Sequence, residues 1–484
     1  MTTTSMPVSE GTTSATITTV NPATGAELAV YPVTTPAEIE AAVDASATAQ
    51  RGWAALDLQE RGQVVRAAAA VLRRRSEELA LLVTREMGKP LAESRAEVEK
   101  SALGCEYYAD NAAAFLTEEE VATSADRSWI SYEPVGIVLA VMPWNFPLWQ
   151  VFRFAAPALM AGDGALLKHS PNTTGCALAV ADVLAEAGLP AGLFTALVVA
   201  EPDVPATTAA LIADPRIGAV TVTGSERAGV AVAVAAGRAI KKSVLELGGS
   251  DPFVVLADAD LPKTAALAAK GRFLNAGQSC ISAKRFIVER AVADEFSRLF
   301  VAAVEALQVG DPEQPGTDVG PLARADLLEG LEAQVQASVA AGATVLTGGR
   351  RPNDGPGNWY LPTVLSGVTP GMPVHDQETF GPVAAVIVAE DEDDAVRIAN
   401  DTPFGLAASV WTSDVDRGIA LGRRITSGAC FVNAVVASDV RMPFGGTRRS
   451  GYGRELGQAG IREFVNTRTW VAMDEPPTQA PNAE

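Results

Sequence analysis

Apolar residues recur along this chain with two different spacings. From about Pro36 to Phe115 they recur at helical intervals in Ala-rich stretches, and Thr35 before Pro36 is typical of a helix start. Farther along, short apolar runs alternate with helix-like stretches. The runs predicted as strands are 136–142, 164–168, 194–199, 219–223 and 243–247. This alternation indicates βαβ units, in which helices cover a parallel sheet.

A second alternating series begins near Asp251. Its predicted strands are 253–256, 285–288, 344–347 and 383–389, and a helix is predicted over 261–275. A domain boundary is therefore expected at Gly248-Gly249. Residues 128–133 and 464–473 alternate polar and apolar positions, so we expect them to form strands outside the main sheets, in a subunit interface.

Composition excludes several classes of protein. The chain has 484 residues, with 38 Lys and Arg against 58 Asp and Glu, and a net charge of −20. Such an acidic chain is a poor general binder of nucleic acid or acidic membranes. We find no membrane-spanning apolar run and no signal peptide. Only two His and four widely spaced Cys are present, so we expect no metal site and a cytoplasmic protein with reduced thiols.

Three short motifs contain groups suited to catalysis. Cys280 follows small and polar residues, as an accessible nucleophile requires, although a lone Cys is more often a packing residue. Glu246 ends a predicted strand at the edge where ligands bind, and it serves either as a base or in a salt bridge. Asn145 stands between Pro143 and Pro147, so its amide is held rigidly, either for an oxyanion hole or as part of a stiff connector.

Four further motifs complete the pattern. Gly224 and Ser225 follow a predicted strand and open a helix, where backbone N–H groups bind pyrophosphate, although an ordinary turn looks the same. The others lie at 168–172, 378–382 and 443–446, and each alone reads as a plain turn. In this order and spacing, the seven motifs resemble the aldehyde dehydrogenase superfamily, from about Asn21 to Val471.

The resemblance implies an α/β fold with two Rossmann-like parallel-sheet domains and a small β oligomerisation arm. The implied dinucleotide-binding domain comprises 20–125 and 140–248, the catalytic domain 249–448, and the arm 126–139 and 449–473. We expect flexible tails at 1–19 and 474–484.

The resemblance also implies a mechanism. Cys280 would attack the aldehyde carbonyl, and Asn145 with the backbone N–H of Cys280 would form the oxyanion hole. Glu246 would activate the water that hydrolyses the resulting thioester. Neither His is needed as a base, so we expect His375 at the surface, and we expect Cys430 to be a packing residue.

NAD or NADP is the implied cofactor. The residues implied to contact it are Trp144, Lys168, Ser170, Gly224, Ser225, Glu378 and Phe380. Lys168 would contact the adenosine ribose, and Glu378 the nicotinamide ribose. Pro171 stands where many NAD-preferring members carry Glu, so no carboxylate is expected at that position to repel a 2′-phosphate. The choice between NAD and NADP therefore stays open.

Four segments look more specifically like bacterial succinate-semialdehyde dehydrogenases, namely 141–162, 245–252, 277–288 and 445–456. Oxidation of succinate semialdehyde to succinate is therefore the implied reaction. A carboxylated aldehyde needs a cation near Cys280. Arg153 shares a helical face with Trp149 and suits a carboxylate, unless it forms a structural ion pair. Ser279 and Ser438 would add hydroxyl donors.

Other activities stay open at this point. The substrate can instead be glutarate semialdehyde, aminobutyraldehyde or a simple aliphatic aldehyde. A relative that passes the acyl group to coenzyme A is disfavoured, because a thiol acceptor needs no water-activating Glu246. A non-catalytic relative is disfavoured because the Cys, Glu and Asn set is intact. The resemblance implies a homodimer or a homotetramer.

Overall fold

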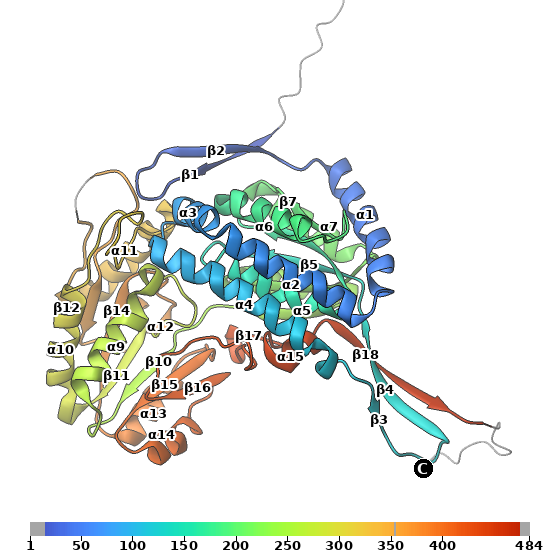
Figure 1. Ribbon diagram of the computed structural model, residues 1–484. Helices are drawn as coiled ribbons and strands as arrows, with labels where there is room; N and C mark the ends of the chain where they lie inside the picture. Colours follow the sequence, from blue (N-terminus) through green and yellow to red (C-terminus); the bar gives the residue numbers. More distant parts are fainter. Residues whose placement is uncertain (1–14, 353–354, 475–484) are drawn as a thin grey trace, which may run out of the picture.

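The computed structural model describes residues 15–352 and 355–474 (Figure 1). It begins with an antiparallel hairpin, β1 (Thr16–Val20) and β2 (Glu27–Pro32). Four helices follow, α1 (Pro36–Ala54), α2 (Leu58–Arg74), α3 (Ser76–Met87) and α4 (Leu91–Phe115). Thr35 and Glu38 form a capping box at the start of α1, which satisfies two backbone N–H groups. The helical prediction for this region is confirmed.

The first sheet has the strand order β17-β9-β8-β5-β6-β7. Its strands are β5 (Ile137–Met142), β6 (Gly164–His169), β7 (Phe194–Leu197), β8 (Ile217–Thr223), β9 (Lys242–Glu246) and β17 (Gly451–Tyr452). The connecting helices are α5 (Trp149–Ala161), α6 (Thr174–Glu186), α7 (Val204–Ala213) and α8 (Glu226–Ala239). All its neighbouring strands are parallel except β17 with β9, so the predicted βαβ units are confirmed.

The second sheet has the order β12-β13-β14-β11-β10-β15-β16. Its strands are β10 (Pro252–Val255), β11 (Arg285–Glu289), β12 (Thr344–Thr347), β13 (Thr363–Ser366), β14 (Val383–Ala389), β15 (Ala407–Trp411) and β16 (Ala429–Val432). The helices here are α9 (Leu261–Phe273), α10 (Ala293–Glu305), α11 (Ala325–Ala340), α12 (Pro373–Asp376), α13 (Glu392–Asn400) and α14 (Val415–Gly422). Only the edge strand β12 is antiparallel to its neighbour, so the sheet is parallel as the resemblance implied.

A third sheet projects from the body of the molecule (Figure 1). It consists of β3 (Glu119–Glu120), β4 (Arg127–Pro134) and β18 (Val465–Ala472), paired antiparallel. The short helix α15 (Gly457–Arg462) precedes β18. Trp129 and Trp470 stack across the strands with ring centroids 5.5 Å apart. The prediction of strands outside the main sheets is confirmed, and their role in an interface stays a prediction.

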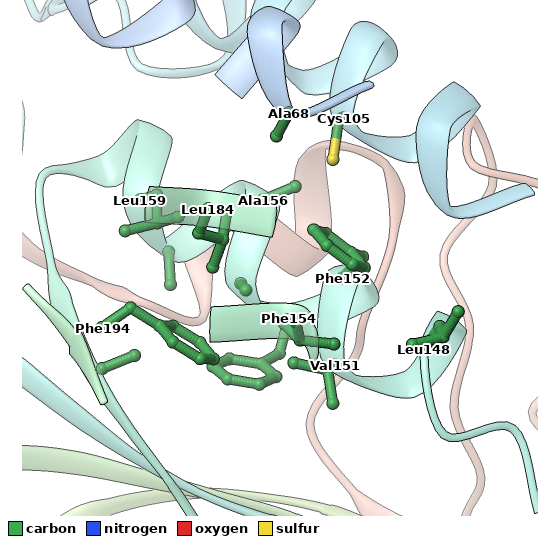
Figure 2. Close-up of a cluster of buried hydrophobic side chains, with 14 of the residues drawn as sticks. Ala68, Cys105, Leu148, Val151, Phe152, Phe154, Ala156, Leu159, Leu184 and Phe194 are labelled. Atoms are coloured by element: carbon green, nitrogen blue, oxygen red, sulfur yellow. The ribbon is translucent and has the colours of Figure 1, made fainter. Parts of the chain in front are cut away.

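The core between the N-terminal helices and the first sheet is centred on α5. Every residue of α5 is buried. Figure 2 shows Phe152 and Phe154 of α5 among side chains from other elements, including Cys105 of α4 and Phe194 of β7. Each large apolar side chain buried this way contributes about 1.5–3 kcal/mol to folding. The packing fixes α5, and with it the three side chains that α5 contributes to the site, Trp149, Gln150 and Arg153.

The structure differs from the predicted organisation in three places. Strand β1 lies inside the predicted tail 1–19, because β-branched residues there pair with β2. The expected tails otherwise concern 1–14 and 475–484, which lie outside the described residues. Strands β5 and β17 extend from segments assigned to the arm into the first sheet. Strands β2, β3, β13 and β15 were not predicted. The domain boundaries themselves stay a prediction.

Candidate functional site

A cavity of about 530 Å³ opens beside the loop that carries Cys280. Its walls come from α4, α5 and α9 and from the segments 279–282 and 434–438. Cys280 lines it together with the four residues predicted to bind substrate, which are Trp149, Arg153, Ser279 and Ser438. The structure thus brings the predicted nucleophile and the predicted substrate contacts into one cavity.

The backbone beside Cys280 is held by a buried lysine. Lys284 donates hydrogen bonds from Nζ to the carbonyl oxygens of Cys280 (2.6 Å) and Ser279 (2.9 Å). Burial raises the pKa of the Cys280 thiol to about 11, although the positive charges of Lys284 and Arg153 act in the opposite direction. The thiol is therefore protonated at neutral pH and must lose its proton to attack a carbonyl.

Asn145 lies against the same loop. Its side-chain Nδ2 donates to the carbonyl oxygen of Gln278 (3.0 Å), and its Oδ1 accepts from Gln150 (3.1 Å). Nδ2 keeps a second hydrogen, and no described residue accepts a hydrogen bond from the backbone N–H of Cys280. A rigid amide and a free backbone N–H near one thiol fit the donor pair of an oxyanion hole.

Glu246 ends β9 and is buried. Among the described residues, neither of its carboxylate oxygens has a hydrogen-bond partner. Burial, and next the nearby Glu455, raise the pKa of the Glu246 carboxyl well above its usual range, against the opposing charges of Arg153 and Arg454. Glu246 does not line the cavity, but its charge acts on the Cys280 thiol. Its raised pKa suits a base that takes a proton from water.

Arg153 is already paired. Its guanidinium forms an ion pair with Glu455, and both side chains are almost completely buried. A second guanidinium nitrogen, Nη2, donates to the hydroxyl of Thr223 (3.1 Å). The arginine reaches the cavity wall, but its charge is balanced by a carboxylate that the sequence did not single out. The structural ion pair left open in the sequence is therefore present.

On the first sheet, two groups fit the adenosine and phosphate side of a dinucleotide. Lys168 in β6 is buried, and no described residue pairs with it. Burial lowers the pKa of its ammonium group to about 8, and Glu201 and Arg324 also act on it electrostatically. Ser225 is the N-cap of α8, whose N-terminus favours a phosphate. The acidic influence of Glu201 was not foreseen, because it comes from a distant part of the chain.

Glu378 and Phe380 lie at the other end of this region. Glu378 accepts a hydrogen bond from the backbone N–H of Gly249 (3.0 Å), and Lys284 lies 3.6 Å from its carboxylate. A Cβ at Gly248 would lie 2.2 Å from the Glu378 carboxylate, so only Gly permits this approach. The Phe380 ring meets Trp144 edge to face, with centroids 5.7 Å apart. A carboxylate beside an aromatic face fits a ribose and a flat ring.

The match to known families covers nearly the whole chain. Residues 9–470 match the aldehyde dehydrogenase family. The chain belongs to the aldehyde dehydrogenase family. The resemblance seen in the sequence motifs is thereby confirmed.

Several characterised or solved aldehyde dehydrogenases are similar to this chain. A probable succinate-semialdehyde dehydrogenase of Synechocystis, designated NADP+-dependent, is 49% identical over 457 residues, which is 94% of this chain and 100% of that protein. A succinate semialdehyde dehydrogenase of Escherichia coli K12, designated NAD(P)+-dependent, is 47% identical, over 93% of this chain and 96% of its own. A crystal structure of succinic semialdehyde dehydrogenase from Streptococcus pyogenes with NADP+ has a TM-score of 0.91 at 34% identity, covering 95% of this chain and 100% of that one. These structural neighbours confirm the predicted α/β fold.

Some side chains lie where the sequence did not place them. His375 is buried, with Nδ1 2.7 Å from the Asp376 carboxylate, instead of lying at the surface, because α12 packs against α11. Cys430 is exposed as a residue, but its sulfur packs against Gly422 of α14. Lys100 and Lys284 were both missed, although each reaches the site. Neither lysine stands in a sequence pattern that distinguishes it from an ordinary surface lysine.

None of the helices in the described part of the chain combines the length and the apolar character needed to cross a membrane.

Proposed function

We propose that this aldehyde dehydrogenase oxidises succinate semialdehyde to succinate with NAD or NADP. The observation that carries the proposal is the cavity in which the Cys280 thiol meets hydroxyl groups and cations. Such a lining recognises an aldehyde that carries a carboxylate at its far end. Relatives of nearly equal length, at 47% and 49% identity, bear the name of this activity.

The chemistry starts at Cys280. The Cys280 thiol gives its proton to water, and the resulting thiolate sulfur attacks the aldehyde carbon. The carbonyl oxygen becomes an oxyanion that accepts hydrogen bonds from Asn145 Nδ2 and the Cys280 backbone N–H. Such donors lower the barrier because they are already oriented toward the developing charge. A nicotinamide cofactor held by Lys168, Glu378 and Phe380 would supply the acceptor for a hydride from the substrate carbon, and loss of that hydride would leave a thioester on Cys280.

The second half of the reaction uses Glu246. In its ionised form the carboxylate takes a proton from a water molecule, and the water oxygen attacks the thioester carbon. The Cys280 sulfur then leaves as the thiolate, and succinate is released. The raised pKa of Glu246 makes its carboxylate a stronger base, which suits the activation of water in an enzyme without a catalytic histidine.

The same proposal assigns the binding residues. Trp144, Lys168, Ser170, Gly224, Ser225, Glu378 and Phe380 hold the cofactor, and Trp149, Arg153, Ser279 and Ser438 line the cavity that takes the substrate. Lys168 is buried and unpaired among the described residues, which supports a role for it with ribose hydroxyls or a 2′-phosphate. The Ser170 hydroxyl donates to the side chain of Asn172 (2.7 Å), so it is held in place at the end of β6.

We also propose that the arm joins subunits into a homodimer or homotetramer, in the cytoplasm. The support is the projecting sheet of β3, β4 and β18, on which apolar Val471 and Met473 are exposed. A projecting sheet with open edge strands and exposed apolar residues gains stability when a second chain covers it. Light scattering of the purified protein and of a variant ending before β18 tests the assembly.

The activity is tested with a panel of aldehydes, each assayed with NAD and with NADP. We expect kcat/KM to be highest for succinate semialdehyde, ahead of glutarate semialdehyde, butanal and 4-aminobutanal, and the product to be free succinate whether or not coenzyme A is added. Cys280→Ala should lower turnover by about 10⁴-fold or more, because it removes the nucleophile. A preference for uncharged aldehydes, or an acyl-coenzyme A product, would contradict the proposal.

A further inference from the structure

Three cations line the cavity beside Cys280, and they differ in what surrounds them. Arg153 is balanced by buried Glu455. Lys270 is exposed to solvent, which screens its charge. Lys100 is half-buried in α4, and no carboxylate of the described residues forms an ion pair with it. Lys100 is thus the shielded cation of this cavity whose charge has no direct partner.

The ammonium group of Lys100 lies in the wall of the cavity and forms one hydrogen bond to the described residues. Its Nζ donates to the Ser438 hydroxyl at 2.6 Å and lies 4.8 Å from the ring centroid of Trp149. Burial, and next the charge of Arg153, lower the pKa of Lys100 to about 8. A cation in such a place is stabilised by an anion that enters the cavity. Two of its three N–H donors have no acceptor among the described residues.

The acidic residues of the cavity wall do not compete for Lys100. Glu97 forms a buried ion pair with Lys89, and its other oxygen accepts the backbone N–H groups of Leu148 (2.8 Å) and Trp149 (3.0 Å). Glu93 accepts the N–H of Asn275 (2.8 Å), and burial raises the pKa of Glu93 to about 7. The carboxylates that line the cavity are therefore either paired elsewhere or partly protonated.

We infer that Lys100 and Ser438 form the receptor for the carboxylate of the substrate. The inference rests on the proposed function and deepens it, because it makes Lys100 the residue that selects anionic aldehydes. The ammonium group and the hydroxyl each donate to one carboxylate oxygen, and the Trp149 ring covers the carbon chain. Arg153 stays with Glu455 and acts on the substrate through its charge, while the contact is made by Lys100.

The test compares Lys100→Met with a matched control, Lys270→Met, which removes a cation from another wall of the same cavity. Met keeps the length and the apolar stem of Lys and removes only the charge. For Lys100→Met we expect the ratio of kcat/KM for succinate semialdehyde to that for butanal to fall roughly 10- to 100-fold, mainly through KM, because hydrogen bonds to charged groups are lost. For Lys270→Met the ratio should stay within about twofold, because exposed charges contribute little.

Two further measurements separate charge from shape. Lys100→Arg should keep most of the ratio, and Lys100→Met should raise kcat/KM for 4-aminobutanal relative to butanal, because a repelling charge is gone. An unchanged ratio in a folded Lys100→Met enzyme would overturn the inference, while a wild-type preference for succinate semialdehyde would still support the proposed function. A wild type without that preference would instead overturn the proposed function. If Lys100→Met does not fold, Ser438→Ala decides, since an unchanged ratio there also overturns the receptor.

Discussion

Two charged regions meet at this cavity, and they are built in opposite ways. In the first, Arg153, Glu455 and Glu246 lie fully buried, and one cation faces two acids. In the second, Lys100 has a hydroxyl and an aromatic ring for neighbours, with no ion-pair partner among the described residues. In the first region Glu455 pairs with Arg153, so Glu246 stays buried without an ion-pair partner and its pKa is raised, as a base for water requires. The second is uncompensated, so it can hold a ligand of opposite charge.

The largest effect is expected in the buried acid region. Glu246→Gln removes the base for hydrolysis, so the steady-state rate should fall roughly 10²- to 10⁴-fold for every aldehyde, charged or not. Reduced cofactor should still form in a burst of about one equivalent, because acyl transfer to Cys280 does not need the hydrolysis step. Rapid-mixing absorbance at the wavelength of the reduced cofactor measures both. An unchanged steady-state rate would remove Glu246 as the base.

The second largest effect is expected on the free energy of unfolding, through the buried ion pair of the same region. Arg153→Met leaves Glu455 buried without its counter-charge, so the free energy of unfolding should fall by about 3–5 kcal/mol. Lys100→Met is the control, because no buried carboxylate depends on it, and its cost should stay below about 1 kcal/mol. Urea denaturation followed by tryptophan fluorescence measures both. Equal losses of stability would mean that the two cations do not differ in the way the structure indicates.

The smallest effect is a dependence on pH that belongs to the second region. Lys100 is protonated below its pKa of about 8 and neutral above it. The preference for succinate semialdehyde over butanal should therefore fall about tenfold between pH 7 and pH 9. The charged groups acting on Lys100 are Arg153, Glu97, Asp439 and Lys89. The other cavity acid, Glu93, titrates near pH 7.

Two features of this measurement isolate Lys100. Taking the ratio of two substrates cancels the titration of Cys280 and Glu246, which act on both. Lys100→Met should remove the decline above pH 8 and leave any contribution of Glu93 in place. A decline that persists in Lys100→Met would assign it to another group.

Most of the fold follows from short-range patterns in the sequence. Strand β5 was predicted, at 136–142, because a continuous apolar run of strand length leaves little choice, and β9 was predicted at 243–247 from a shorter apolar run followed by Gly. Strands β13 and β15 were missed because their runs are short and lie among Pro, Gly and Thr residues that read as turns. Strand β1 was missed because a run of Thr resembles a polar tail until its partner β2 is known.

The residues of the candidate site also divide into those with a local sequence signal and those without one. Cys280, Glu246 and Asn145 were found because their neighbours in sequence carry the signal. Lys100 was not, because its partner Ser438 lies 338 residues away, and no local pattern connects a lysine in a helix to a serine in a distant loop. Arg153 was found, but its pairing with Glu455 was not, because an ion pair between distant segments produces no periodic pattern in the sequence.

The two hydrogen bonds that Lys284 donates to the Cys280 loop have a consequence for redesign of the cavity. One wall, at Ser279 and Cys280, is anchored by a buried ammonium group that holds two carbonyl oxygens. A second wall, 434–438, carries the Ser438 hydroxyl, which accepts one side-chain hydrogen bond from Lys100. Libraries that vary 434–438 can therefore reshape the space for new aldehydes while the sulfur atom keeps its position. The wall at Ser279 and Cys280 holds the nucleophile that performs the reaction, and the wall at 434–438 shapes the space for the substrate.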